Sequence, residues 1–505
     1  MIILGISAGF HDAAVTVLQN GNILFASHSE RYSKKKNDPW LNQDIINEAL
    51  TYGKPDLIAL HEDSKLKKLR ALKSGDFAMA KEMSQASWIK KFYPQLAGIP
   101  IKEYKHHETH AAAGALTATY HQCAVMVIDA IGEFDTASIW IWKGKKLKKL
   151  HSITYPSSLG LFYTAMTNRV GLKPMEDEYI LMGMAAYGEP KKAMKLYRQM
   201  GHDFFKHPWA FTNPAEAIEM KTNVHKGISD KMYKEYSDFD IALAAQTQLE
   251  ERVYAYAEYA REITGCRKLV FMGGVALNCV ANSGLFECGF DVVNIMPNPG
   301  DAGSSLGAAA LAYLHAKDRK VKWESPYLGK KIPGRYPVQQ ALGSLERGEI
   351  FGIANGRAEF GPRALGNRSL MADPRGTEIK DKVNKIKKRQ EFRPFAPVIL
   401  EEHVHDYFDM PNDITASPYM QFTARCKKPN EFPAIVHKDG TSRVQTVNIH
   451  DHPGLYLLLT EFYNKTGCPM LLNTSLNIKG QPIVNDIEDV ALFAKQYGVP
   501  VYTSD

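Results

Sequence analysis

Two histidines in the stretch KHHETHAAAGAL, residues 105–116, have the spacing of a metal-binding pair. His106 and His110 are four positions apart, so on a helix their rings project from one face and could hold one ion. The stretch also resembles the zinc-protease signature HExxH, but the glutamate follows His107 and the next histidine comes too early. Helical periodicity alone favours the simpler interpretation that the pair lies on the surface of a helix.

Two glycine-rich loops have the composition of ligand-binding loops. In KLVFMGGVALNCVANSGL, a β run precedes Gly273-Gly274, and we expect a helix to begin near Val275. Two glycines allow a ligand to approach the backbone, and a helix N-terminus favours an anion, although a double glycine also marks any tight turn. Asp301 lies in the Gly/Pro loop of MPNPGDAGSSLGAAALAYL, where a plain N-cap role would satisfy it as well.

The N-terminal region contains a repeated unit of strands and tight turns. IILGI, AAVTVL and the hairpin signal Asn20-Gly21 return as AVMVIDAIGEFDTASIWIWKGKKL. A shift of 123 positions places Gly9 on Gly132, Asp12 on Asp135, Ala14 on Ala137, Gly21 on Gly144 and Leu24 on Leu147. Shared glycine turns could produce such a match by coincidence, but the common register favours a duplicated β-hairpin. Two such units predict an α/β fold of the actin- or Hsp70-like class, with the hairpins facing each other across a nucleotide cleft.

Composition and size restrict the class of protein. A chain of 505 residues with 45% hydrophobic and 23% charged residues predicts two or three domains of an ordinary globular protein. No basic leader and no apolar run of roughly 20 residues is present, which argues against secretion and membrane insertion. Six cysteines without a C-x-x-C pair favour a reduced, cytoplasmic chain, and the net charge of +7 is compatible with phosphate partners.

The C-terminal part is rich in basic residues. A Lys-, Gly- and Pro-rich stretch between about Lys317 and Leu345 predicts a linker between domains. Four arginines then follow among glycines and prolines, namely Arg357, Arg363, Arg368 and Arg375. Arginines on rigid loops suit bidentate recognition of phosphate or carboxylate. A helix with Ile379, Val383 and Ile386 on its apolar stripe ends in KKR, which is either a solvated face or a phosphate contact.

The basic aromatic strand IWIWKGKKLKKLH has two interpretations. It could contact a nucleic acid, but alternation of Trp with Lys is also typical of a half-buried edge hairpin. We favour the hairpin, because nucleic-acid surfaces concentrate their charge more strongly.

A series of motifs along nearly the whole chain resembles the O-carbamoyltransferases of the nodulation-factor, cephamycin and aminoglycoside type. These are GGVALNCVANSGL, NPGDAGSSLGAA, EFGPRALGNRSLMADPR, EFRPFAPVIL, DGTSRVQTV and NTSLNIKGQPIV, in the order of that family. The resemblance implies a metal-binding, actin-like transfer domain over residues 1–343, akin to the tRNA threonylcarbamoyl-transfer enzyme. It also implies a YrdC-like domain over residues 344–505, which forms carbamoyl-adenylate from carbamoyl phosphate and ATP.

The resemblance also implies the residues of two sites. In the transfer domain the metal ligands are His106, His110, Asp129 and Asp301, for which Fe(II) is the family expectation, although Zn and Mn also suit two imidazoles and two carboxylates. The nucleotide contacts expected there are Gly132, Gly273, Gly274 and Asn278. The phosphate site of the C-terminal domain comprises Arg363, Arg368, Lys387, Arg389, Arg393, Arg443, Asn473, Thr474 and Ser475. His107 and Glu108 are expected to have outer or solvent roles.

The sequence departs from the family pattern at two positions. Ile180 replaces a usual Lys, which puts one polar contact of the transfer domain in doubt, and Gln390 replaces a usual Glu. Neither position is one of the expected metal ligands or lies in the arginine-rich loops.

The expected reaction is transfer of a carbamoyl group to an acceptor hydroxyl, which requires a base within hydrogen-bond reach. His11 and Asp12, at the first hairpin turn, are the candidates, although Asp12 could also be a plain turn residue. The acceptor is a small metabolite, a sugar or a hydroxymethylated nucleotide, and a homodimer is compatible with the family. Two alternatives are a tRNA threonylcarbamoyladenosine-type enzyme and a non-catalytic, ATP-binding module of actin type.

Overall fold

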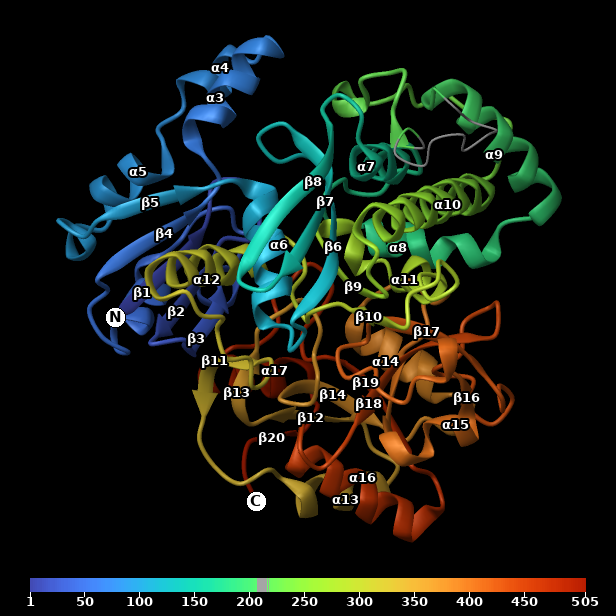
Figure 1. Ribbon diagram of the computed structural model, residues 1–505. Coiled ribbons are helices and arrows are strands. Elements are labelled where there is room, and N and C mark those ends of the chain that lie inside the picture. The colour runs from blue at the N-terminus through green and yellow to red at the C-terminus, as the bar shows by residue number, and fades with distance from the viewer. Residues whose placement is uncertain (207–215, 217) are drawn as a thin grey trace. The chain divides into compact units, whose positions relative to one another are not determined.

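The computed structural model describes residues 1–206, 216 and 218–505 (Figure 1). The chain forms two compact units, Met1–Ser29 with Asn37–Trp323, and Glu30–Lys36 with Glu324–Asp505. The division falls inside the expected linker, ahead of the expected boundary at 343/344, because β11 (Tyr327–Ile332) already pairs with β13 (Gly356–Glu359) of the second unit. The segment Glu30–Lys36, which the sequence predicts as part of the N-terminal domain, also belongs to the second unit.

The first unit contains two five-stranded sheets with the same topology. Their strand orders are β3-β2-β1-β4-β5 and β8-β7-β6-β9-β10, and in each sheet an antiparallel meander is followed by two parallel strands. The strands are β1 (Ile2–Ser7), β2 (Ala14–Gln19), β3 (Asn22–His28), β4 (Leu57–His61), β5 (Ile101–Tyr104), β6 (Gln122–Ile128), β7 (Asp135–Lys143), β8 (Lys146–Thr154), β9 (Lys268–Met272) and β10 (Val292–Asn294). This identity of strand order confirms the predicted duplication. The aromatic, basic stretch forms β7 and β8, with β8 at the sheet edge, as the hairpin interpretation predicts.

Two helices rich in small residues pack against each other and against these sheets (Figure 1). Helix α6 (His106–Thr117) contacts β6 and β9, and α12 (Ser304–Lys317) contacts β1 and β4. Gly307 makes the helix contact possible, since a Cβ there would lie 1.9 Å from the carbonyl oxygen of Thr109. Gly5 in β1 likewise allows α12 to pack closely on the sheet, since a Cβ there would lie 2.0 Å from the carbonyl oxygen of Ser305. The first turns of α6 and α12 are therefore held close together.

The other helices of the first unit surround this core. They are α2 (Gln43–Leu50), α3 (Ser64–Lys73), α4 (Phe77–Lys81), α5 (Gln85–Phe92), α7 (Leu159–Arg169), α8 (Glu178–Met184), α9 (Pro190–Phe204), α10 (Asp238–Thr264) and α11 (Cys279–Gly284). Helix α10 begins with a capping box of Ser237 and Asp240 and ends at Gly265, a left-handed C-cap. Within the described part of the chain, no helix combines the length and apolarity that a membrane crossing needs.

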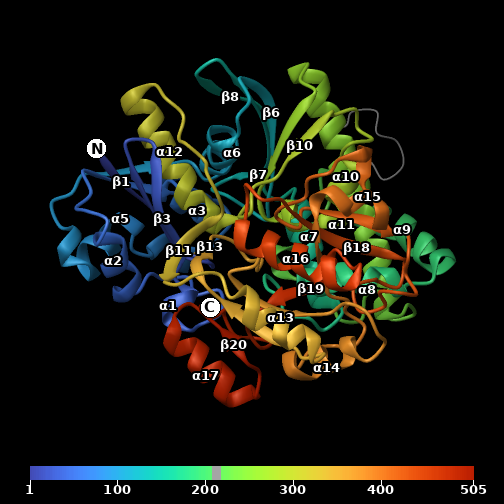
Figure 2. The same ribbon diagram turned by 90° about the horizontal axis from the view of Figure 1, so that it is seen from below.

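The second unit is built on one eight-stranded mixed sheet with the order β16-β17-β18-β15-β19-β14-β12-β20. Its strands are β12 (Phe351–Ala354), β14 (Arg368–Ala372), β15 (Ala396–Leu400), β16 (Phe408–Asp409), β17 (Phe422–Cys426), β18 (Thr441–Val447), β19 (Met470–Ser475) and β20 (Val501–Tyr502). Its helices are α1 (Glu30–Ser33), α13 (Val338–Glu346), α14 (Ile379–Lys387), α15 (Val404–Tyr407), α16 (Pro453–Thr466) and α17 (Ile487–Tyr497). Helices α13 and α16 pack together and lie side by side in both views (Figures 1 and 2). Helix α14 is the helix predicted from its apolar stripe.

Candidate functional site

Four side chains of the first unit converge on one point. His106 and His110 come from the first turns of α6, Asp129 follows β6, and Asp301 lies in the loop before α12. The Nε2 atoms of the two histidines are 3.2 Å apart. His110 Nε2 lies 3.0 Å from Asp129 Oδ2 and 3.0 Å from Asp301 Oδ1, and His106 Nε2 lies 3.3 Å from the same two oxygens. Such spacings are those of ligand atoms around one ion.

Local hydrogen bonds orient the two imidazoles. His106 is the first residue of α6, and the preceding Lys105 makes no side-chain cap. The backbone N–H of His106 donates instead to Glu133 Oε1 at 2.9 Å. His110 Nδ1 lies 3.2 Å from the carbonyl oxygen of Pro299 and 3.0 Å from Ser304 Oγ. A carbonyl can only accept, so Nδ1–H donates to it and the lone pair is left on Nε2, which faces the carboxylates.

The double-glycine loop holds Asp129 rather than opening a regular helix. Gly274 N–H donates to Asp129 Oδ1 at 3.3 Å, and Ala130 N–H donates to the same oxygen at 2.8 Å. Gly273 has a φ of +92°, and a Cβ there would lie 2.2 Å from the carbonyl oxygen of Ile128. The helix expected near Val275 is instead a single 3-10 turn. This loop leaves Asp129 Oδ2 directed at the histidines.

Two of the predicted nucleotide contacts have other partners in the structure. Asn278 caps α11 by accepting from Ala281 N–H at 3.1 Å, and its amide exchanges hydrogen bonds with the amide of Gln246. Gly132 packs under the first histidine, since a Cβ there would lie 3.0 Å from His106 Cβ. Gly132, Gly273 and Gly274 thus surround the cluster of His106 and Asp129, whereas Asn278 is tied to Gln246 of α10.

The electrostatics of the cluster favour a cation. Although burial and the neighbouring Asp301 oppose ionisation, hydrogen bonds from His106 and His110 hold the pKa of Asp129 below its ordinary value. Burial likewise opposes a charge on His106, yet Asp301 and Asp129 raise its pKa well above the ordinary value. Two buried carboxylates that attract protons to neighbouring imidazoles form a set in which a metal ion can replace those protons. Two nitrogen and two oxygen donors fit Fe(II), Zn or Mn.

His11 and Asp12 lie beside this cluster. His11 Nδ1 is 3.0 Å from Asp12 Oδ2, and His11 Nε2 is 3.6 Å from Asp301 Oδ2. Burial opposes the charge, but Asp12, Asp301 and Asp129 raise the pKa of His11 to about 10. Asp12 has a φ of +53°, as a residue of a tight turn does. A base must be unprotonated near neutral pH, and a cation bound at Asp301 would lower the pKa of His11 toward that range.

Sequence reasoning missed two buried residues at the end of β4, His61 and Glu62. The ring centroid of His61 lies 4.3 Å from that of His106, and Glu62 Oε1 lies 4.0 Å from His106 Nδ1. Glu62 has a φ of +92°, rare for a residue with a side chain, and its carboxylate pairs with Lys67 at 3.0 Å. The only sequence signal was the pair HE directly after the apolar run LIAL. His107, for which an outer or solvent role was expected, is buried and bonds Ser138.

Basic residues of the second unit gather around the end of β19. Lys387 Nζ donates to the carbonyl oxygen of Ser475 at 2.5 Å, to Ser475 Oγ at 3.1 Å and to Asn477 Oδ1 at 2.6 Å. Burial, together with the charges of Arg389 and Arg393, holds the pKa of Lys387 well below its ordinary value. A concentration of positive charge around one buried ammonium group would be relieved by an anion.

The remaining predicted residues of this site are held in different ways. Arg389 donates to Asn384 Oδ1 at 2.7 Å and stacks on Phe395, with its guanidinium carbon 3.8 Å from the ring centroid. Asn473 donates to Gln445 Oε1 at 2.7 Å, and its own Oδ1 is buried without a hydrogen-bond partner in the described chain. Arg443 Nε, in β18, is likewise buried and unpartnered there. Thr474 pairs with Leu370 in the sheet, and Arg363 lies half-buried between β13 and β14.

Arg368 does not fit the predicted phosphate contact. Its side chain is fully buried, and its five N–H groups all face carbonyl oxygens at 2.8–3.3 Å. These carbonyls belong to Lys330, Asn355, Asn367 and Asn485, and the carbonyl oxygen of Gly356 is a further acceptor at 3.3–3.4 Å. A guanidinium with every donor engaged has none left for a ligand, so Arg368 joins backbone segments of the second unit instead.

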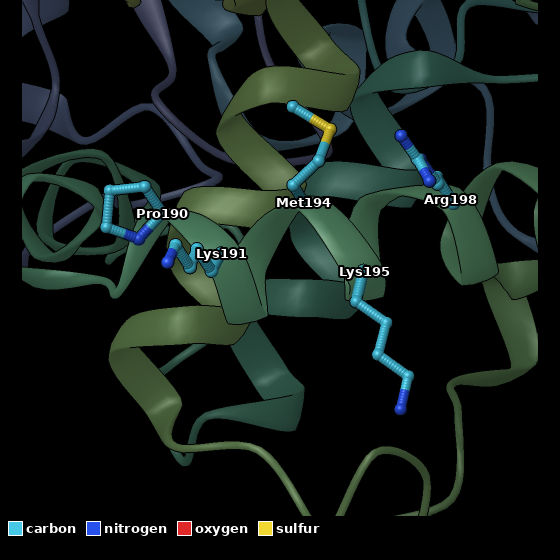
Figure 3. A pocket seen from close by; sticks show the side chains of 5 residues that line it. All are labelled: Pro190, Lys191, Met194, Lys195 and Arg198. Carbon is cyan, nitrogen blue, oxygen red and sulfur yellow. The ribbon is translucent and has the colours of Figure 1, made fainter.

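A hollow of about 420 Å³ lies outside both clusters, on α9. Pro190, Lys191, Met194, Lys195 and Arg198 line it, and Figure 3 shows all five side chains on this one helix. None of them is a predicted site residue, and they offer no buried polar group for catalysis.

Comparison with known proteins connects these clusters to a family. Residues 68–310 match the family profile of the carbamoyltransferase N-terminus, and residues 343–503 match that of the carbamoyltransferase C-terminus. Nodulation protein NolO of Bradyrhizobium diazoefficiens is 33% identical over 76% of this chain and 74% of its own length. Nodulation protein NolNO of Sinorhizobium fredii is 30% identical over 95% of this chain and 76% of its own length.

A relative with a named reaction is similar from end to end. The 3'-hydroxymethylcephem-O-carbamoyltransferase of Amycolatopsis lactamdurans is 28% identical over 99% of this chain and 97% of its own length. The matches extend through the histidine–aspartate cluster of the first unit and the basic cluster of the second. The chain therefore belongs to the O-carbamoyltransferase family, and it is a carbamoyl-transferring enzyme.

Proposed function

We propose that this O-carbamoyltransferase works in two steps, one in each unit. The second unit, by family resemblance YrdC-like, uses one water molecule to release phosphate from carbamoyl phosphate, and the carbamate formed attacks the α-phosphate of ATP, which gives carbamoyl-adenylate and releases pyrophosphate. The first unit, actin-like by its duplicated sheets, then moves the carbamoyl group to an acceptor hydroxyl and releases AMP. The observation that supports this most directly is that each unit has a polar cluster of its own, with carboxylates and imidazoles in one and basic groups in the other.

The residues of the second unit suit the activation step. Carbamoyl phosphate and ATP are both anionic, and Lys387, Arg389 and Arg393 supply positive charge close together. Arg363 stands on a loop whose backbone is held by Glu359, so its planar guanidinium can donate two hydrogen bonds to a phosphate in a set direction. Arg443 and the amide of Asn473 add polar groups with unused hydrogen-bonding capacity.

The residues of the first unit suit the transfer step. His106, His110, Asp129 and Asp301 would hold a divalent metal, for which we propose Fe(II). When bound, such a metal supplies Lewis acidity and a fixed position for an oxygen ligand. His11 lies next to Asp301 and is the proposed base for the acceptor hydroxyl, with Asp12 holding its ring at 3.0 Å. Deprotonation by His11 makes the hydroxyl oxygen a nucleophile for the carbamoyl carbon.

The acceptor belongs to the class of hydroxylated small molecules, meaning metabolites, sugars or hydroxymethylated nucleotides. One relative is named for a hydroxymethyl acceptor, and on this ground we propose a primary alcohol as the first candidate. We place the reaction in the cytoplasm, since all six cysteines are buried and free.

An acceptor-free assay tests the proposal. The purified protein is incubated with ATP and carbamoyl phosphate, and pyrophosphate is measured over time. We expect pyrophosphate release that requires both substrates and that precedes any transfer. Parallel incubations with candidate alcohols, analysed by mass spectrometry for the gain of one carbamoyl group, identify the acceptor. Carbamoylation of an alcohol without ATP, or with no pyrophosphate formed, would contradict the adenylate route.

A further inference from the structure

His61 lies against the proposed metal ligands but belongs to a different element. It ends β4, whereas His106 and His110 are on α6, and its side chain is 1% exposed. Its ring centroid is 4.3 Å from that of His106 and 5.6 Å from that of His110. One ligand atom from each of His61, His106, His110 and Asp301 can be chosen so that all four lie within 4.8 Å of one another. Opposite ligand atoms of one ion are roughly 4 Å apart for bonds of roughly 2.1 Å, so a set of this size is close to that of one metal site.

The hydrogen bonds of Thr109 determine which nitrogen of His61 bears the proton. Thr109 Oγ1 donates to the carbonyl oxygen of His106 at 2.7 Å, which uses its only hydrogen. His61 Nδ1 lies 2.6 Å from the same hydroxyl oxygen, so Nδ1–H must be the donor there. A neutral imidazole with its proton on Nδ1 has its lone pair on Nε2.

This lone pair is buried and unused within the described chain. His61 Nε2 has no hydrogen-bond partner, and a buried acceptor without a partner is costly. The usual arrangement of a metal-binding histidine is a lone pair facing the ion and an N–H fixed by a second group, here Thr109. His61 has both features, although the position of Thr109 within the sequence HETHA did not suggest them.

The neighbouring His107 lacks this combination and serves as a comparison. It is equally buried, but its ring centroid is 5.7 Å from that of His106 and 6.3 Å from that of His110. Its Nδ1 lies 2.8 Å from Ser138 Oγ, and that oxygen already accepts from Trp140 Nε1. The hydroxyl of Ser138 is thus able to donate to Nδ1, which puts the ring proton of His107 on Nε2. His107 is also outside the set of converging ligand atoms.

We propose that Nε2 of His61 is a further protein ligand of the metal in the first unit. The inference rests on the metal site of the proposed function and extends it by a third imidazole. Three nitrogen and two carboxylate donors favour a borderline ion such as Fe(II), Co(II) or Zn(II) over Mg(II). Five protein donors leave one position of a six-coordinate ion for an oxygen of the substrate.

Titration of the metal-free, full-length protein with Co(II) tests this ligand, because Co(II) absorption reports the number and type of donors. The variant is His61→Asn, whose amide can still donate to Thr109 but has no Nε2, and the matched control is His107→Asn. We expect His61→Asn to weaken Co(II) binding on the order of 10- to 100-fold and to change the visible spectrum. We expect His107→Asn to leave both unchanged. Circular dichroism confirms folding of each variant.

A measurement on the unmodified protein makes the test independent of any variant. Each imidazole bound to Co(II) through Nε2 contributes one strongly shifted N–H proton in the NMR spectrum, so the proposal expects three such protons. Two protons, or a folded His61→Asn protein with the affinity and spectrum of the wild type, would overturn it. If His106→Ala weakens binding while His61→Asn does not, only the role of His61 fails. Absence of Co(II) binding to the wild type would refute the metal site as well.

Discussion

Arg363 and Arg368 come from one short stretch, GPRALGNR, but Arg363 is half-buried whereas Arg368 is fully buried. Arg368 gives all five N–H groups to backbone carbonyls, whereas Arg363 stands on a loop that other groups hold in place. Glu359 Oε1 fixes that loop by accepting from the backbone N–H groups of Leu365 at 2.8 Å and Asn367 at 2.9 Å. The same residue type therefore serves structure at one position and, in our proposal, phosphate binding at the other.

Arg363→Lys tests the proposed phosphate contact. Lysine keeps the charge but loses the planar pair of donors, so we expect carbamoyl-phosphate-dependent pyrophosphate release to fall on the order of 100-fold, equivalent to about 2–3 kcal/mol. Metal content and melting temperature should not change.

Arg368→Lys is the matched control from the same stretch. It leaves several buried carbonyls without donors and should lower the free energy of unfolding by about 3 kcal/mol. Kinetics and melting curves on both variants separate the two roles. Near-normal turnover of Arg363→Lys with a lowered melting temperature would show that Arg363 only braces its loop.

At the scale of elements, helix α16 depends on an uncharged histidine at its start. His452 Nδ1 accepts from Leu455 N–H at 3.0 Å, so Nε2–H donates to Asn367 Oδ1 at 2.8 Å. The rings of Tyr327 and Tyr336 enclose it, each with its centroid 5.0 Å away. Burial lowers the pKa of His452 to about 4. Protonation would remove the acceptor that caps the helix.

This cap predicts a pH dependence of stability. The pKa of His452 is about 6.5 in the unfolded chain and about 4 in the folded one, so the unfolded chain takes up the proton first on acidification. The contribution of neutral His452 to the free energy of unfolding is present above pH 6.5 and is lost as the pH falls toward 4. Between pH 7 and pH 5 we expect the wild type to lose about 2 kcal/mol more than His452→Asn, since Asn caps helices without titrating. Urea unfolding at both pH values measures this, and equal losses would contradict it.

At the scale of the whole molecule, the two proposed steps depend on clusters in different units. The histidine–aspartate cluster belongs entirely to the unit of Met1–Ser29 and Asn37–Trp323. The basic cluster belongs to the unit of Glu30–Lys36 and Glu324–Asp505. Loss of the transfer step should therefore leave the activation step measurable.

His106→Ala tests this division. We expect loss of bound metal and of carbamoyl transfer, with pyrophosphate release close to that of the wild type, because the activation groups lie in the other unit. Asp301→Ala should behave in the same way, and chelation of metal from the wild type should reproduce the result. Metal analysis, the pyrophosphate assay and the transfer assay are run on one preparation. A folded His106→Ala protein that releases no pyrophosphate would argue against separate sites.

The sequence by itself determined the features that depend on local patterns. Glycine turns and alternating apolar residues predicted both hairpin units, and the i, i+4 spacing placed His106 and His110 on one helix face. The family resemblance implied that Asp129 and Asp301 join them, and the structure brings all four side chains together. The apolar stripe of Ile379 and Val383 predicted α14. The hairpins, the histidine pair and α14 follow from backbone periodicity or from residues a few positions apart, whereas the two aspartates were implied only by the family resemblance.

Only the tertiary structure decided which distant groups meet. His61 reaches the cluster because the end of β4 brings its ring next to those of His106 and His110, and nothing in LIALHED shows those neighbours. In the sequence Arg368 resembles the neighbouring arginines, and only its carbonyl partners, which include Lys330 and Asn485, show its structural role. The segment Glu30–Lys36 belongs to the second unit, where Arg31 donates to the carbonyl oxygen of Gly361 at 3.2 Å. The role of a buried polar group depends on its hydrogen-bond partners. Tertiary packing brings these partners from distant parts of the chain, whose positions local periodicity does not predict.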